Sequence, residues 1–192
     1  MESNNKSALQ SSMESGVFFG VFLVIMNIAL YFFKVKALSF SGNILMLLIQ
    51  LIVYFFFIYF YTKRYKEREL EGFISYNQAF FYGIMLMFFS AIILSFFLFI
   101  LNKYIDPDLA HKNFEQAKEM TITFMQKHGI PEDKIDSTIQ RLDASGIPNA
   151  AQIAINNIFS SLILGLILSL ISAAILKKTA NPFDAEKQNN EF

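Results

Sequence analysis

Hydrophobic and polar residues follow one another along this chain in long blocks, and four of the apolar blocks contain no Asp, Glu, Lys, Arg or His. These blocks are Val17–Phe33, Ile44–Tyr61, Ala79–Leu101 and Ile153–Leu176. A bilayer core about 30 Å thick needs roughly 20 apolar residues in a helix to cross it. The pattern therefore predicts an all-α membrane protein with four transmembrane helices in up-down order.

The polar blocks predict the rest of the organisation. Residues 1–16 are expected to form a polar N-terminal tail, and residues 179–192 a disordered C-terminal tail. The first two spans are joined by a short stretch, with Ser41-Gly42 as its turn signal. Residues 102–150 form a long polar insertion, and the fourth transmembrane helix then occupies residues 151–178.

Lysine and arginine predict the orientation, because they are enriched in the short cytoplasmic loops of membrane proteins. With the N-terminus inside, eight of these residues fall on the cytoplasmic side and five near a span on the opposite side. The first span alone has more positive charge after it than before it. The overall count nevertheless favours both termini cytoplasmic and the insertion 102–150 extracytoplasmic, and we expect the protein to lie in the cell (inner or plasma) membrane.

The insertion predicts an amphipathic helical hairpin between the third and fourth spans. Its first helix is expected to use Asp106 as N-cap and Pro107 as first helical residue, and to stop at Gly129. The second helix is expected to start at Pro131 and stop at Gly146. One face of the first helix is apolar, and we expect this face to contact a partner or the membrane surface. The face consists of Leu109, Phe114, Met120, Phe124 and Met125.

Small and polar residues recur at every fourth position of the last span. They are Asn157, Ser161, Gly165 and Ser169. Small residues let two helices approach closely, and amide or hydroxyl groups can hydrogen-bond across the contact. The ridge could also be a polar seam that conducts or binds something, but helix packing is favoured, either within the chain or in a homo-oligomer. Gly16 and Gly20 form a shorter ridge that we expect to meet it.

Several stretches of the chain together resemble a known family. The third span begins near SYNQAFFYGIMLMFF, the run NKYIDPD leads into the insertion, and the last span closes with ILKK. In this layout the chain is similar to the domain of unknown function 4199 family, over roughly residues 14 to 178. The resemblance implies an integral membrane protein, mostly bacterial, whose activity is not established. It implies no functional residues.

Composition and motifs indicate little catalytic chemistry. The chain has no cysteine and a net charge of zero, so neither thiolate chemistry nor a nucleic-acid partner is expected. It has no GxSxG, phosphate loop or zinc-binding histidine motif. His111, Glu115 and Glu119 could hold a divalent metal together with a second element, but a solvated helix face is favoured. We therefore expect no catalytic residues, no metal site and no cofactor.

The sequence does not specify an activity, and it leaves three hypotheses. The favoured one is a non-enzymatic accessory or envelope protein that binds a partner through its helical insertion. The alternative is a small uncoupled channel or permease, and the third is a membrane enzyme acting through His111, Glu115 or Asp106. The expected partners are the lipid bilayer and either a second copy of the chain or another membrane or envelope protein. The uncharged polar residues that could line a channel are Asn27, Gln50, Ser90, Ser95 and Asn156.

Overall fold

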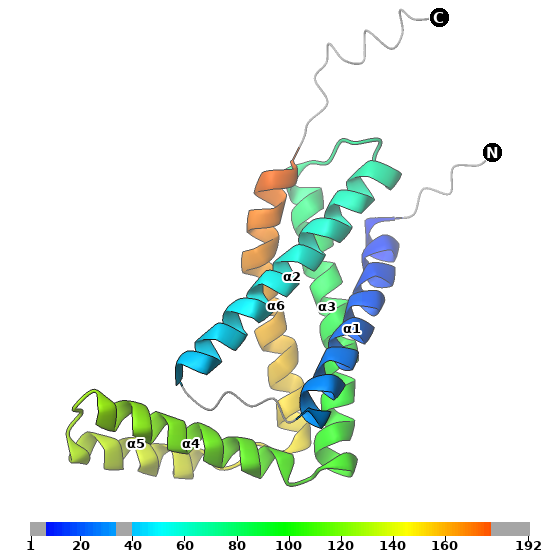
Figure 1. The fold of residues 1–192 in the computed structure, drawn as a ribbon. Helices are drawn as coiled ribbons and strands as arrows, with labels where there is room; N and C mark the ends of the chain where they lie inside the picture. The colour runs from blue at the N-terminus through cyan, green and yellow to red at the C-terminus, as the bar shows by residue number, and fades with distance from the viewer. Residues whose placement is uncertain (1–6, 34–39, 178–192) are drawn as a thin grey trace, which may run out of the picture.

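The computed structural model describes residues 7–33 and 40–177, and every regular element longer than a turn among them is a helix. Four helices are long and apolar enough to cross a membrane. They are α1 (Ala8–Phe32), α2 (Phe40–Glu69), α3 (Tyr76–Ile100) and α6 (Ala150–Leu176). The prediction of an all-α protein with four apolar spans is confirmed. Successive spans run in opposite directions (Figure 1).

A hairpin of two helices connects the third and fourth spans. The chain first continues from α3 into a short π-helix, η1 (Leu101–Ile105), and then forms α4 (Leu109–Lys127) and α5 (Glu132–Ser145). In Figure 1 the hairpin lies across the lower ends of the spans and projects to one side, whereas α1 begins and α6 ends at the upper side. The hairpin is therefore at the opposite end of the bundle from the two ends of the described chain.

Helix α3 is the centre of the bundle, because it packs against both α1 and α6. Glycines make the contact with α1 close. A Cβ at Gly16 would lie 2.7 Å from the carbonyl oxygen of Leu86, and a Cβ at Gly20 would lie 2.8 Å from the Cβ of Ile93. The expectation that these glycines meet the last span is wrong, since α1 and α6 each pack against α3 rather than against one another.

The ridge of small residues on α6 also faces α3. A Cβ at Gly165 would lie 2.8 Å from the Cβ of Met87. One turn later, Ser169 lies directly against the position where Gly83 lacks a side chain. Ser161, Gly165 and Ser169 are all buried. The ridge therefore lies against another helix of the same chain.

Among the side chains of α2 that the structure describes, the buried ones begin at Tyr54. Tyr54 and Ile58 are buried in the core, where the ring of Phe19 contacts Tyr54 edge-on and stacks on Phe57 at 4.4 Å. In contrast, every residue from 44 to 50 is exposed. Apolar side chains that are exposed all round a helix need an apolar surrounding. The first half of α2 thus presents a surface suited to lipid.

The first three spans begin earlier than the sequence predicted, and α3 begins at Tyr76 rather than Ala79. α1 begins at Ala8 because the Ser7 hydroxyl accepts a hydrogen bond from the Gln10 N–H, so residues 8–16 belong to the first helix. α2 begins at Phe40, so the predicted turn at Ser41-Gly42 is wrong. Serine and glycine are tolerated there, because the N–H groups of a first helical turn have no partner in the helix.

Parts of the predicted polar segments fall outside the described residues. These are residues 1–6 of the predicted N-terminal tail, residues 34–39 between the first two spans, Lys178 and the predicted disordered tail 179–192.

Candidate functional site

The hairpin is held together by an apolar seam between α4 and α5. Ile135 is buried with 5% of its surface exposed, and it is the one buried residue in these two helices, which are described throughout. The predicted apolar face of α4 is partly exposed along its length, and its first two residues, Leu109 and Phe114, line a cleft at the root of the hairpin. The residues of this face are Leu109, Phe114, Met120, Phe124 and Met125. The hairpin thus covers its own apolar face only in part.

An ion pair and a glycine turn fix the shape of the hairpin. The Lys118 ammonium donates to Oδ1 of Asp143 at 2.6 Å, and this hydrogen bond raises the pKa of Lys118. The predicted stop at Gly129 is confirmed, with φ at +67°. The N–H of Gly129 bonds to the carbonyl of Gln126 at 3.0 Å, and the N–H of Ile130 bonds to the carbonyl of Met125 at 3.1 Å. These two bonds form the paired closure of a Schellman motif.

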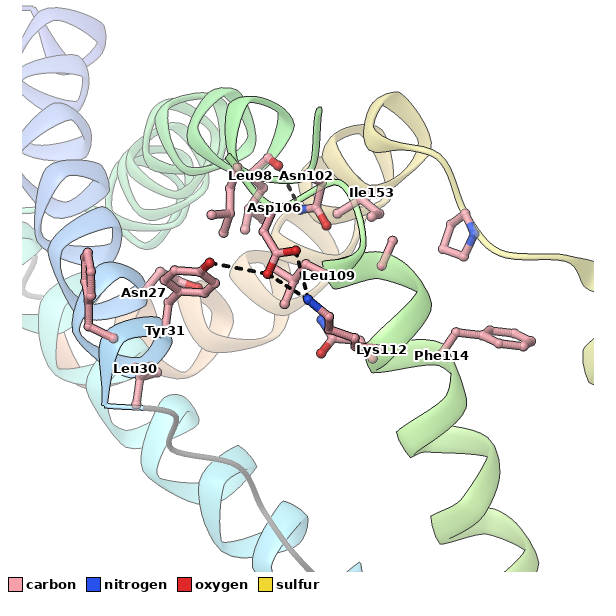
Figure 2. Close-up of a pocket in the computed structure, with 15 residues that line it drawn as sticks. Asn27, Leu30, Tyr31, Leu98, Asn102, Asp106, Leu109, Lys112, Phe114 and Ile153 are labelled. Carbon is pink, nitrogen blue, oxygen red and sulfur yellow. Dashed lines mark hydrogen bonds and ion pairs between the residues drawn. The ribbon is translucent and has the colours of Figure 1, made fainter. Parts of the chain in front are cut away.

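The root of the hairpin is organised by Asp106. Its carboxylate accepts a hydrogen bond from the Tyr31 hydroxyl at 3.3 Å and from the Lys112 ammonium at 3.1 Å (Figure 2). The predicted N-cap role of Asp106 is therefore wrong. The helix begins instead at Leu109, since the Asp106 carboxylate is engaged by side chains of α1 and α4. One side chain thus ties the end of the first span, the end of η1 and the start of α4 together.

The two charges at the root differ in exposure. The Asp106 side chain is 17% exposed and the Lys112 side chain 51%. The hydrogen bond with Asp106 is the main cause that raises the pKa of Lys112 above its ordinary value. Lys112 therefore stays an ammonium at neutral pH, with part of its surface open to other molecules.

A cleft of about 900 Å³ opens beside these groups. It lies between the ends of α1 and η1 and the starts of α4 and α6 (Figure 2). The ends of the spans supply apolar walls, and the polar groups of the cleft come from Asn27, Tyr31, Asn102, Asp106, Lys112 and Asn113. The apolar wall residues include Leu30, Phe32, Leu98, Leu101 and Ile153, together with Leu109 and Phe114 of α4.

Of the five polar residues that could line a channel, four are engaged in hydrogen bonds within one helix or in pairs. Asn27 donates to the carbonyl of Leu23, and Ser90 to the carbonyl of Met87. Asn157 donates to the Ser95 hydroxyl at 2.9 Å, which joins α6 to α3. The amide of Gln50 donates to the Tyr54 hydroxyl, and Asn156 is exposed. These contacts do not join the residues into one polar path.

His111, Glu115 and Glu119 remain a ladder along α4. Within residues 7–33 and 40–177, no three His, Cys, Asp or Glu side chains are grouped so that they could hold a metal ion. His111 and Glu119 are exposed, and Glu115 is partly exposed.

Sequence reasoning missed Tyr31 and Lys112 as members of a site. Tyr31 and Asp106 are 75 residues apart, and no local pattern links them. The π-helix that turns Asp106 toward α1 was also missed. π-helical turns often occur at functional sites, so the presence of η1 favours a functional site at the root of the hairpin.

Comparison with known proteins adds the family and no activity. No curated protein and no solved structure matches the chain. The sequence profile described as "Protein of unknown function (DUF4199)" matches residues 14–178, which include all four spans and the hairpin apart from the first residues of α1. With a match over most of its length, this chain belongs to the DUF4199 family of proteins of unknown function.

Proposed function

We propose that the protein is a non-enzymatic membrane accessory protein that binds a partner protein through the α4–α5 hairpin. The observation that carries the proposal is the incomplete cover of the apolar seam, where Ile135 alone is buried. Burying apolar surface is favourable by about 25 cal/mol per Å². The partly exposed side chains of α4, such as Phe124 and Met125, would therefore gain from a further surface.

The charge of the hairpin favours a protein over the bilayer as that surface. Between Asp106 and Gly146 there are eight acidic residues against five basic ones, a net charge of −3. Helices that bind membrane surfaces carry mainly lysine and arginine on their polar face, because bilayers contain anionic lipids. An acidic hairpin suits a protein partner with a basic rim around an apolar groove.

We place the hairpin on the extracytoplasmic side of the cell membrane and both termini in the cytoplasm. Support comes from Lys63, Arg64, Lys66 and Arg68, which lie near the end of α2. That end of α2 is opposite to the hairpin in Figure 1. Basic residues beside spans are enriched on the cytoplasmic side, so their position favours the opposite side for the hairpin.

A channel or permease receives less support from this structure. Four of the five residues that could line a channel are engaged in separate hydrogen bonds, as Ser95 is with Asn157, and the fifth, Asn156, is exposed. Hydrogen bonds of this kind between helices stabilise a bundle without needing a conducting path.

The experiment compares two neighbouring positions on α4. The full chain is tagged at its C-terminus, crosslinked in intact cells and purified in mild detergent, and the crosslinked proteins are identified by mass spectrometry. Phe124→Asp places a charge on the partly exposed apolar face of α4, whereas Thr123→Asp places the same charge at an exposed position. We expect a stoichiometric partner with the wild type and with Thr123→Asp, and its loss with Phe124→Asp.

All variants must reach the membrane fraction in equal amounts, so that loss of the partner reports on the hairpin surface. A crosslinked product at twice the mass of the chain would identify a second copy as the partner. Equal crosslinking of Phe124→Asp and Thr123→Asp would show that the apolar face of α4 does not bind the partner.

A further inference from the structure

The cleft at the root of the hairpin combines two opposite charges with apolar walls. We propose that it binds a zwitterionic phospholipid that carries a primary ammonium group, as phosphatidylethanolamine does. Its phosphate lies at Lys112, its ammonium lies at Asp106, and the first part of an acyl chain lies along the apolar walls. This proposal uses the cleft, whereas the proposed partner is tested at Phe124, which does not line the cleft, so the two proposals can fail separately.

The polar groups can serve such a headgroup without losing their own contacts. A lysine ammonium has three N–H donors. The Lys112 ammonium donates to both carboxylate oxygens of Asp106, with nitrogen–oxygen distances of 3.1 and 3.4 Å. A carboxylate offers about four acceptor positions, and three of them take hydrogen bonds from Lys112 and Tyr31. Among the bonds of the described residues, one donor of Lys112 and one acceptor of Asp106 are therefore left for a phosphate and an ammonium.

The apolar walls of the cleft favour the binding of an amphiphile over that of a water-soluble ion. Leu30 and Phe32 come from the end of α1, Leu98 from the end of α3, and Ile153 from the start of α6. These positions are the ends of three spans, where an acyl chain begins in a bilayer. A cleft of about 900 Å³ has room for a headgroup and the start of one chain.

The residue types around the cleft indicate that it lies at the depth of the lipid headgroups. The Lys103 ammonium lies over the rings of Phe99 and Tyr104, at 5.2 and 5.5 Å from their centres. Tyr104 is 68% exposed. Tyrosine and lysine gather at the interface between the hydrocarbon core and water, where the aromatic ring meets the headgroups. Lys103 and Tyr104 belong to η1, which forms part of the same site.

Charge complementarity selects among phospholipids. Asp106 disfavours a headgroup that carries only negative charge, such as phosphatidylglycerol, because like charges at short distance repel. The quaternary ammonium of phosphatidylcholine has no N–H to donate to Asp106. A primary ammonium beside a phosphate satisfies both Asp106 and Lys112.

The test measures lipid binding to the purified full-length protein by native mass spectrometry. The delipidated protein is mixed in turn with phosphatidylethanolamine, phosphatidylcholine and phosphatidylglycerol of identical acyl chains. We expect phosphatidylethanolamine to bind at least about tenfold more tightly than either of the others, which corresponds to one hydrogen bond to a charged group. Equal binding of the three lipids would overturn the proposal, and tighter binding of phosphatidylglycerol would show a site for anionic lipids instead.

Variants of Asp106 and Lys112 test which residue binds the ammonium and which binds the phosphate of the headgroup. Asp106→Asn should remove the preference over phosphatidylcholine, and Lys112→Gln should weaken the binding of both lipids. Lys118→Gln is the matched control, because Lys118 pairs with Asp143 outside the cleft. If Lys112→Gln binds phosphatidylethanolamine as Lys118→Gln does, the phosphate does not lie at Lys112. The comparison of lipids on the wild type needs no variant, so it decides the proposal even if Asp106→Asn fails to fold.

Discussion

Replacement of Gly16 by alanine tests the close contact between α1 and α3. The new Cβ would lie 2.7 Å from the backbone oxygen of Leu86 and 2.7 Å from the Cβ of Phe89. Neither atom is the end of a flexible side chain, so α1 has to move away from α3. Membrane helices associate largely through van der Waals packing, and such a movement loosens it along the contact.

The magnitude follows from two opposing effects. Overpacking a close contact costs about 1–3 kcal/mol, and the upper half of that range applies because a backbone atom is in the way. Alanine in a helix interior is favoured over glycine by about 1 kcal/mol. We therefore expect Gly16→Ala to lower the free energy of unfolding by about 1–2 kcal/mol, which is roughly a tenfold fall in the ratio of folded to unfolded protein.

The assay is unfolding of the purified protein in mixed micelles with increasing sodium dodecyl sulfate, followed by far-ultraviolet circular dichroism. Val17→Ala is the matched control, since Val17 is the next residue of the same helix and is 42% exposed. We expect the free energy of unfolding of Val17→Ala to stay within about 0.5 kcal/mol of the wild-type value. A Gly16→Ala protein as stable as the wild type, or more stable, would refute the reasoning, because the helix preference of alanine would then outweigh the contact.

Three further predictions concern single contacts. Asn157→Ala should destabilise the bundle by about 0.5–1.5 kcal/mol in the same assay, because the Ser95 hydroxyl loses its partner, whereas Asn156→Ala at an exposed position should not. Gly129→Ala should speed hydrogen exchange in the hairpin, since alanine resists a φ of +67°, and Gly129→Asn should have a smaller effect. The pKa of Lys118 is raised, so its bond to Asp143 contributes fully below the ordinary lysine pKa and is lost as pH rises through the raised value. Spin labels on α4 and α5 should therefore report a constant hairpin around neutral pH and a looser one only at strongly alkaline pH, a transition that Lys118→Met should remove.

Some helix starts could have been found more exactly from the sequence. α3 begins after Ser75, whose hydroxyl accepts from the Gln78 N–H while the Gln78 side chain accepts from the Ser75 N–H. Asn149 and Gln152 form the same reciprocal pair at the start of α6. This capping box leaves a pattern of two residues three positions apart. The start of α3 at Tyr76 was therefore available from local signals.

The number of spans, the hairpin and its glycine stops were determined by the sequence alone. Their signals are local, because the length of an apolar block and the need for a positive φ at Gly129 do not depend on the rest of the fold. The every-fourth-residue spacing also identified the ridge of α6 from sequence, since residues four apart share one helix face.

Tertiary structure alone decided what these surfaces contact. The glycines of α1 meet α3 rather than α6, which depends on how three spans are arranged around one another. The cleft exists because η1 turns Asp106 toward Tyr31, 75 residues earlier in the chain. A hydrogen bond between residues so far apart leaves no periodic trace in the sequence, because either partner alone is an ordinary residue at the end of a helix. The sequence thus determined which helices form, and only their packing could place Tyr31, Asp106 and Lys112 in one site.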